Sequence, residues 1–374
     1  MNEKKLRVAK PVLVAATLAT ILWVSAGSLT PPAGPIASTM KDLATVEPRI
    51  PISATTTPGD ATTLFRITQP GSYYLTGNIT GVSGKSGIEI AASGVTLDLM
   101  GFDLLGVAGS LDGIRVTVAV TDIAVVDGSV RNWSADGVDL SGANNSRLGD
   151  LRVSANAGDG INAGTNGVVT KCAAYSNGGS GIRNLFGSIT DCSARNNSGP
   201  GIYSADSCTI TNCSATSNTF AGIAAAGGST ITNCKAKSNG GNGIQGGFSS
   251  TIINCVTEQN ENNGIFAISD CTIRGNTCYS NRLSAGGGNG AGIHATGLAN
   301  RIEGNNCTNN ARGIALDATG NFITRNTCRG NTTNWDIAAG NVCLVVSATA
   351  GAAILGNSGG VAPGSTDPNA NFTY

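Results

Sequence analysis

Apolar and polar residues alternate in short runs along most of this chain, and the same order of runs returns every 20 or 21 residues. The two-residue period of each run is typical of half-buried β-strands, and the runs are too short for helices. A glycine followed by isoleucine marks the repeat most clearly. Its regular copies are Gly160-Ile161, Gly181-Ile182, Gly201-Ile202, Gly222-Ile223, Gly243-Ile244, Gly264-Ile265, Gly292-Ile293 and Gly313-Ile314.

The repeat length decides the fold class. A repeat this short has room for only two or three strands and their turns, so each copy buries its apolar side against its neighbours. The sequence therefore predicts an all-β solenoid with coils of about 21 residues. Looser copies at Gly87-Ile88, Gly113-Ile114 and Gly137-Val138 predict longer turns in the early coils, and Leu283 to Gly290 extends one later coil by a glycine-rich loop.

Within a coil, the tract Thr209-Ile210-Thr211-Asn212-Cys213 recurs at 230–234 and, with one change, at 251–255. These β-branched tracts predict strands. An asparagine returns once per coil after them, and stacked coils about 4.8 Å apart let such amides hydrogen-bond to each other. We therefore predict an asparagine ladder formed by Asn177, Asn197, Asn218, Asn239, Asn260, Asn281, Asn310 and Asn331.

The coil length, the stacked isoleucines and the asparagine ladder resemble the right-handed parallel β-helix superfamily. Its members include pectate lyases, polygalacturonases, phage tailspikes and the periplasmic NosD-like proteins. The resemblance covers roughly Phe65 to Asn341 and implies a right-handed parallel β-helix with capped ends. It implies no particular reaction, because function varies freely on a shared fold.

The N-terminus has the pattern of a signal peptide at 1–26, with basic residues before an apolar run from Val12 to Val24. That run is shorter than the roughly 18 to 20 residues of a membrane span, so we expect cleavage, no membrane span afterwards, and a secreted or periplasmic protein. Residues 27–59 predict a Pro/Thr-rich linker with one short helix near Lys41 to Val46. The β-helix is expected at 60–341. The repeat is expected to fail at Trp335, and 342–374 to form a final strand and cap.

The amino-acid composition limits the classes of partner that this protein is expected to bind. Only 12% of the 374 residues are charged and the formal net charge is zero, which disfavours nucleic acid as a partner. Most of the eleven cysteines occupy repeated coil positions, where in-register neighbours stand too far apart for a relaxed disulfide. We expect free, buried thiols, and a bridge between Cys208 and Cys213 stays open. With one histidine, His294, expected to be solvated, and three methionines, no metal site is predicted.

Outward-facing residues carry the candidate chemistry. Asp112, Asp136 and Asp159 each precede the repeated glycine on successive coils, so their carboxylates are expected about 5 to 10 Å apart. Together with Arg115, they are the candidate catalytic group for glycoside cleavage, or ligands for calcium. Aspartate before glycine is also a common turn combination without catalytic function. The candidate binding residues project beside this column and are Asp139, Asn162, Arg183 and Tyr203.

Two functions follow from these candidates. The first is an exported, noncatalytic β-helix that displays an elongated surface to a glycan or a cell-envelope partner, with no cofactor. The alternative is a polysaccharide lyase or glycoside hydrolase that acts on an acidic polysaccharide, with calcium as a candidate cofactor. The first is favoured because the sequence lacks the Asn-Thr-Asp, Gly-His-Gly and Arg-Ile-Lys tracts of polygalacturonases and the Trp-Ile-Asp-His tract of pectate lyases.

Overall fold

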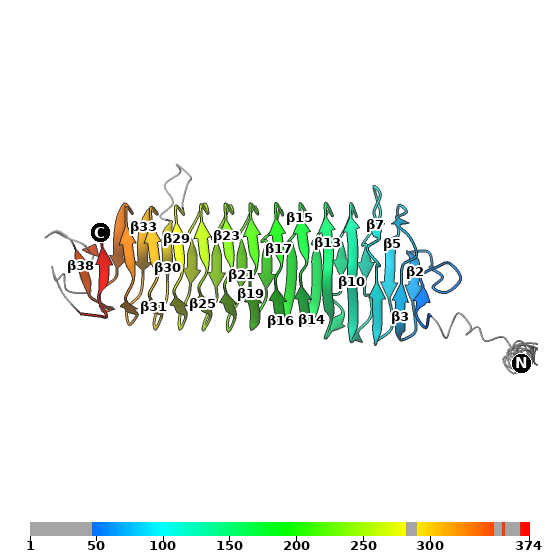
Figure 1. Cartoon of the computed structure of the whole chain (residues 1–374), viewed down its shortest axis with the longest axis horizontal. Helices are drawn as coiled ribbons and strands as arrows, with labels where there is room; N and C mark the ends of the chain where they lie inside the picture. The colour runs from blue at the N-terminus through cyan, green and yellow to red at the C-terminus, as the bar shows by residue number, and fades with distance from the viewer. Residues whose placement is uncertain (1–46, 282–289, 348–353, 356–366) are drawn as a thin grey trace, which may run out of the picture. The chain divides into compact units, whose positions relative to one another are not determined.

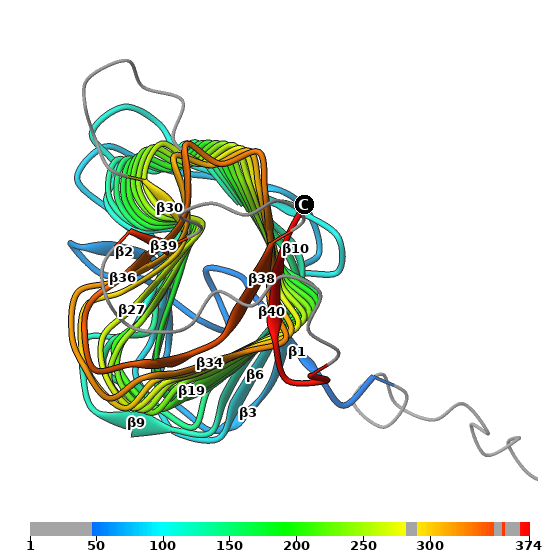
Figure 2. The same cartoon turned by 90° about the vertical axis from the view of Figure 1, so that its left-hand side faces the viewer.

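The computed structural model describes residues 47–281, 290–347, 354, 355 and 367–374. Arg49–Tyr374 form one compact unit, and the predicted signal peptide and short helix lie outside the described residues. Within this unit the strands stack side by side along one axis (Figure 1), and successive coils superimpose when viewed along that axis (Figure 2). Every strand pairing is parallel, and the described residues contain no helix. The predicted all-β parallel solenoid is confirmed.

The strands form three ladders, each of which receives one strand or part of a strand from nearly every coil. Ladder 1 consists of β2 (Thr63–Ile67), β5 (Ser86–Ile90), β8 (Ile114–Arg115), β11 (Val138–Asp139), the first parts of β14 (Ile161–Thr170) and β16 (Ile182–Thr190), β18 (Ile202–Ser204), β21 (Ile223–Ala225), β24 (Ile244–Gly246), β27 (Ile265–Ala267), β30 (Ala291–Ala295), β33 (Arg312–Leu316), β36 (Thr333–Ile337) and β39 (Ile354–Leu355).

Ladder 2 consists of β1 (Ile50–Pro51), β3 (Gly71–Tyr74), β6 (Val95–Asp98), the first parts of β10 (Ile123–Arg131) and β13 (Arg147–Ser154), the last parts of β14 and β16, β19 (Cys208–Thr211), β22 (Thr230–Thr232), β25 (Thr251–Ile253), β28 (Thr272–Arg274), β31 (Arg301–Glu303), β34 (Phe322–Thr324) and β37 (Val342–Cys343).

Ladder 3 consists of β4 (Ile79–Thr80), β7 (Asp103–Leu105), the last parts of β10 and β13, β15 (Ala173–Tyr175), β17 (Ser193–Arg195), β20 (Ser214–Thr216), β23 (Lys235–Lys237), β26 (Val256–Glu258), β29 (Thr277–Tyr279), β32 (Asn306–Thr308), β35 (Thr327–Arg329), β40 (Asn371–Thr373) and β38 (Val345–Ser347). Two short strands, β9 (Val120–Thr121) and β12 (Ala143–Asn144), pair beside the early coils.

The repeated Gly-Ile pairs build the core. Ile202 lies in register between Ile182 and Ile223, and all three side chains are fully buried. The preceding glycine is required by close approach, because a Cβ at Gly201 would lie 2.5 Å from Nδ2 of Asn218 and 2.7 Å from the carbonyl oxygen of Gly222. One residue type therefore fills the interior while the other lets neighbouring coils approach.

The predicted asparagine ladder is confirmed. Each of its amides donates from Nδ2 to Oδ1 of the asparagine on the next coil, over 2.8 to 3.1 Å, from Asn156 to Asn331. Two further ladders were not predicted, because their members are fewer and appear only in the later coils. They are Asn276, Asn305, Asn326 and Asn371, and Asn300, Asn321 and Asn341.

All eleven cysteines are free and buried. Free thiols were predicted for the stacked cysteines, and the bridge between Cys208 and Cys213 that the sequence left open is not formed. Cys172, Cys192, Cys213, Cys234 and Cys255 occupy one coil position, and the amide of Asn276 continues that position by accepting a hydrogen bond from the Cys255 backbone N–H over 2.8 Å. The thiols thus act as small apolar side chains in the core.

The thiols should be chemically silent in the native state. Burial raises the pKa of the Cys343 thiol to about 12, whereas hydrogen bonds with neighbouring thiols lower the pKa of Cys192 and Cys255. All eleven thiols are buried, and a thiol that a reagent cannot reach reacts slowly. We expect a water-soluble disulfide reagent to label none of the eleven thiols in the folded protein and all eleven after denaturation. Two fewer thiols after denaturation would reveal a disulfide and contradict this structure.

Both ends of the folded unit differ from the predicted boundaries. Residues 27–59 were expected to be linker, but β1 pairs with β3 and Ile52 lies in the core, so the unit begins at Arg49. Proline is compatible with β1 because this strand lies at the edge of its ladder. The repeat does not fail at Trp335, whose indole occupies the position of Ile314 on the preceding coil. The repeat was not recognised in the sequence at this coil because tryptophan stands where the other coils have isoleucine.

Candidate functional site

Asp112, Asp136 and Asp159 form a column at the corner where each coil enters ladder 1, as predicted. Each carboxylate accepts a hydrogen bond from a backbone N–H of the next coil. Oδ1 of Asp112 accepts from Asp136 over 3.1 Å, Oδ1 of Asp136 accepts from Asp159 over 2.6 Å, and Oδ1 of Asp159 accepts from Ser180 over 2.6 Å. One oxygen of each carboxylate therefore joins successive coils.

Stacking like charges at a half-buried corner changes the acidity of this column. Burial raises the pKa of Asp136 to about 6, against the backbone hydrogen bond from Asp159, and the carboxylates of Asp159, Asp139 and Asp112 add to the rise. Burial also raises the pKa of Asp112. The ionised form of Asp136 is thus disfavoured in the folded protein relative to the unfolded chain, whose aspartate pKa is 3.8.

This shift predicts how stability depends on pH. A carboxyl group with a raised folded-state pKa stabilises the fold at low pH, and that contribution is lost as the pH rises from about 4 through about 6. Asp136→Asn keeps an oxygen for the Asp159 N–H and removes the charge. We expect this variant to melt above the wild type at pH 7.5 and close to it at pH 4, in thermal scans at one heating rate.

The exposed Asp127→Asn variant is the control for loss of a carboxylate. Asp127 also belongs to an early coil, and its side chain is exposed. Its backbone has a positive φ of 53°, which asparagine tolerates as well as aspartate does. An equal difference between Asp136→Asn and the wild type at both pH values would contradict the raised pKa.

Arg115 does not lie free beside the aspartate column. Its Nη2 pairs with Oε2 of Glu89 over 3.0 Å and donates to Oγ1 of Thr62 over 3.0 Å. Glu89 also pairs with Arg66, whose Nε lies 3.4 Å from Oε1 of Glu89, and the Thr117 hydroxyl donates to the same Oε1 over 2.8 Å. These partners reduce the exposure of Glu89 to 3% although the residue faces outward. Arg115 is engaged by this carboxylate.

The residues that follow each Gly-Ile pair stand in register on ladder 1, and we call them the outward column. All four candidate binding residues contact a neighbour along it. Nδ2 of Asn162 donates to Oδ1 of Asp139 over 3.3 Å, and the Arg183 guanidinium lies 5.4 Å from the centre of the Tyr203 ring. The column comprises Arg66, Glu89, Arg115, Asp139, Asn162, Arg183, Tyr203, Ala224, Gln245, Phe266, His294, Ala315 and Asp336.

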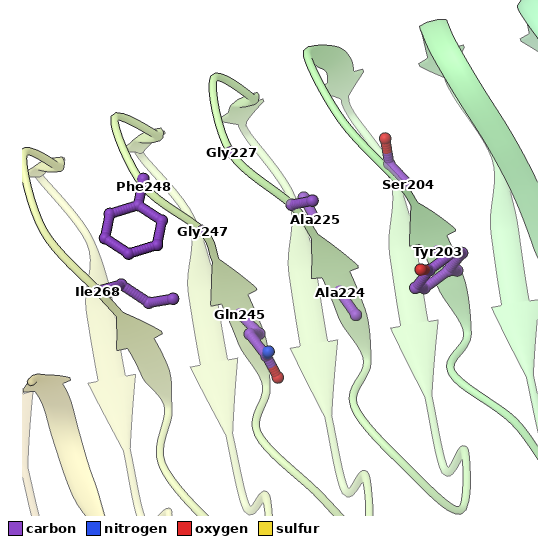
Figure 3. A pocket seen from close by; sticks show the side chains of 10 residues that line it. Tyr203, Ser204, Ala224, Ala225, Gly227, Gln245, Gly247, Phe248 and Ile268 are labelled. Carbon is purple, nitrogen blue, oxygen red and sulfur yellow. The ribbon is translucent and has the colours of Figure 1, made fainter.

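A groove of about 300 Å³ opens on this face, beside the later part of the outward column. Figure 3 shows Tyr203, Ala224 and Gln245 on successive coils, with Phe248 and Ile268 near the turns that follow the strands. Small residues leave the space. The full lining is Tyr203, Ser204, Ala224, Ala225, Ala226, Gly227, Gln245, Gly247, Phe248 and Ile268.

The lining of the groove contains no charged side chain. Phe248 is 57% exposed, so its ring presents apolar surface to a ligand. Tyr203 supplies a second ring, held in place by Arg183. The Gln245 amide has no hydrogen-bond partner among the described residues and offers two donors and an acceptor. Aromatic surface with a small number of polar groups is the usual chemistry of a small-ligand site.

The groove includes one of the eight candidate residues, Tyr203. Asp139, Asn162 and Arg183 lie on the same column but on earlier coils. Of the catalytic candidates, Arg115 also lies on an earlier coil of this column, and the three aspartates lie at the corner beside it. The signal that was missed is the low volume of Ala224-Ala225-Ala226-Gly227 and Gly246-Gly247. A depression formed by small side chains has no sequence motif, because it depends on four coils lying side by side.

His294 is more enclosed than predicted. Its Nε2 lies 2.9 Å from Oδ2 of Asp317 and its ring meets the Phe266 ring edge-on, with centroids 5.8 Å apart. Across the described ranges, no three histidine, cysteine, aspartate or glutamate side chains are grouped to hold a metal ion. That part of the chain also has no helix with the length and apolar character of a membrane span.

Comparisons with known proteins agree with this architecture. Residues 86–232 match the family model described as a right handed beta helix region, and residues 190–358 match the one described as periplasmic copper-binding protein (NosD). No curated protein matches the sequence.

Solved structures share the fold at low identity. The A-module of the Azotobacter vinelandii mannuronan C-5 epimerase AlgE4 is 16% identical, with 84% of this chain and 90% of that chain covered and a TM-score of 0.50. The A-module of AlgE6 from the same organism is 16% identical, with 85% of this chain and 89% of that chain covered and a TM-score of 0.47. The catalytic domain of a GH87 alpha-1,3-glucanase is 12% identical, with 87% of this chain and 63% of that chain covered and a TM-score of 0.48.

The parallel ladders and the coil repeat define this protein as a parallel β-solenoid with a shallow groove on one outward face. The family matches add the hand of the coil. The chain is a protein of the right-handed parallel β-helix superfamily, with no specific enzyme family matched.

Proposed function

We propose that this protein is an exported, noncatalytic β-helix that binds a polysaccharide or a cell-envelope glycan in the groove beside the outward column. The observation that carries the proposal is the lining: two aromatic rings, a glutamine amide without a partner, and a floor of alanine and glycine. Sugar rings combine an apolar face with a rim of hydroxyl groups. They therefore suit a site that offers aromatic faces together with one amide.

The direction of the groove also supports a chain-like ligand. Tyr203 and Ile268 lie three coils apart, which corresponds to roughly 14 Å along the solenoid axis. A groove that is open along its length and crosses several coils suits several consecutive units of a linear polymer. The same groove gives little enclosure to a single small molecule.

Two comparisons support the setting of this function. One matching family model describes a periplasmic protein, in line with the predicted signal peptide at 1–26. The mannuronan C-5 epimerase module, whose fold is similar, is by its name a protein that acts on a polysaccharide.

A polysaccharide panel tests the proposal. We expect at least one glycan to bind the full chain without being cleaved, and Phe248→Ala to weaken that binding roughly tenfold, because burial of an aromatic face contributes about 1 to 2 kcal/mol. Isothermal titration calorimetry measures the affinity. Phe220→Ala is the matched control, since Phe220 is 60% exposed at a turn and does not line the groove. An equal loss in both variants would contradict a site at the groove.

One observation favours a second candidate, a polysaccharide lyase or glycoside hydrolase that uses Asp112, Asp136, Asp159 and Arg115. A carboxyl group with a pKa of about 6, as at Asp136, suits a general acid near neutral pH. The same panel, scored for unsaturated and reducing-end products with and without calcium, separates the candidates. Turnover that Asp136→Ala abolishes would replace the noncatalytic function with this one.

A further inference from the structure

We propose that the glycan in the groove is uncharged, and that the coils preceding the groove repel polyanionic chains. This inference rests on the proposed function and specifies the class of its ligand. The first observation is the lining itself, which holds no arginine, lysine or histidine that would pair with a carboxylate or sulfate of the ligand. Recognition of a polyanion ordinarily relies on such cations.

The second observation is the charge of the coils on the N-terminal side of Tyr203. The outward column and the aspartate column together carry five carboxylates there against three guanidinium groups, a formal charge of −2. The carboxylates are Glu89, Asp112, Asp136, Asp139 and Asp159, and the guanidinium groups are those of Arg66, Arg115 and Arg183.

The cations do not offset this charge evenly. Arg66 and Arg115 both pair with Glu89, at 3.4 and 3.0 Å. Arg115 lies next to Asp139 in register, but its guanidinium is bonded to Glu89. Arg183 is the cation nearest the groove on these two columns, and its Nη1 is already 4.0 Å from Oδ2 of Asp159. A second carboxylate approaching Arg183 from a ligand would meet the like charge of Asp159.

The distance between the charged coils and the groove determines how the repulsion of an anionic glycan depends on its chain length and on the salt concentration. Along the outward column, Arg183 lies about 5 Å and Asp139 about 14 Å from Tyr203, given a spacing of about 4.8 Å per coil. The Debye length is about 8 Å at 0.15 M ionic strength and about 30 Å at 0.01 M. An anionic chain that extends beyond the groove over these coils is therefore repelled, most strongly at low salt. On the other side, Phe266, His294, Ala315 and Asp336 continue the column, and the Asp336 carboxylate is paired with Arg312 at 2.9 Å.

Matched glycan pairs test the inference. β-1,4-Mannan and mannuronan oligosaccharides of equal length differ only at C-6, as do cello-oligosaccharides and their glucuronan counterparts. We expect calorimetry with the full chain in 0.01 M salt to show the neutral member of a pair binding at least about fivefold more tightly, a difference of roughly 1 kcal/mol. The ratio should shrink in 0.3 M salt and grow with the length of the chain.

A charge variant identifies the origin of the ratio. Asp139→Asn combined with Asp159→Asn keeps the oxygens that accept the N–H groups of Ser141 and Ser180 and removes two charges. It should raise the affinity for the anionic member toward that of the neutral one, and Asp127→Asn should not. Tighter binding of the anionic member in wild type would overturn the inference and leave the proposed function standing. Absence of binding to every glycan of the panel, these pairs included, would contradict both.

Discussion

Replacing Asn218 by alanine should cost about 3 to 5 kcal/mol of folding free energy, which is a large loss for a side-chain truncation. Oδ1 of Asn218 accepts from both N and Nδ2 of Asn197, each at 3.0 Å, and its Nδ2 donates to Ala194 O at 3.2 Å and to Asn239 Oδ1 at 3.0 Å. Alanine leaves the backbone N–H of Asn197 and one hydrogen of its Nδ2 without an acceptor, and it removes a donor from the Ala194 carbonyl, in a site that is 1% exposed. Urea unfolding followed by circular dichroism measures the loss.

The exposed Asn262→Ala variant is the control, because it makes the same chemical change outside the ladder. We expect it to change the unfolding midpoint by no more than a surface substitution does, about 0.5 kcal/mol. A loss at Asn218 as small as that of the control would mean that water replaces the missing amide and that the ladder adds little to stability.

Placing a large side chain in the groove should abolish glycan binding. Ala224 belongs to the outward column and forms part of the groove floor, so Ala224→Trp fills the space without entering the core. We expect affinity for any glycan found with the wild type to fall roughly 100-fold or more, because the ligand loses its contacts with both Tyr203 and Phe248. Calorimetry gives the affinity, and circular dichroism shows that the fold is retained.

The same substitution on another face provides the control. Ala173 is exposed on the outward side of ladder 3, so Ala173→Trp adds an equal apolar surface at a distance from the groove. Binding that survives in Ala224→Trp, or that falls equally in Ala173→Trp, would place the ligand elsewhere on the molecule.

Much of the fold follows from sequence because the structure repeats itself. When Ile182, Ile202 and Ile223 occupy one coil position, parallel pairing in register is the arrangement that stacks them, and the asparagine and cysteine positions follow from the same register. The prediction was poorer where copies diverge. Trp335 continues the isoleucine position in a form that the pattern did not show.

The candidate site was less accessible to prediction for two physical reasons. The burial of Glu89 depends on Arg66, Arg115 and Thr117, which lie on different coils, so no local pattern indicates it. The groove is defined by the small volume of residues such as Ala224 and Gly227 between larger neighbours. Residue type showed where charges lie, whereas the shape of the surface required the stacked coils.

The order of strands in ladder 3 has a consequence for synthesis of the protein. β40 lies between β35 and β38 and pairs with both, although β38 precedes it in the chain. Earlier coils can be added one after another as the polypeptide grows, each upon a finished neighbour. The position beside β35 in ladder 3 stays vacant until residues 371–373 have been made, so a nascent chain presents an open strand edge, liable to pair with another chain, until translation has passed that point.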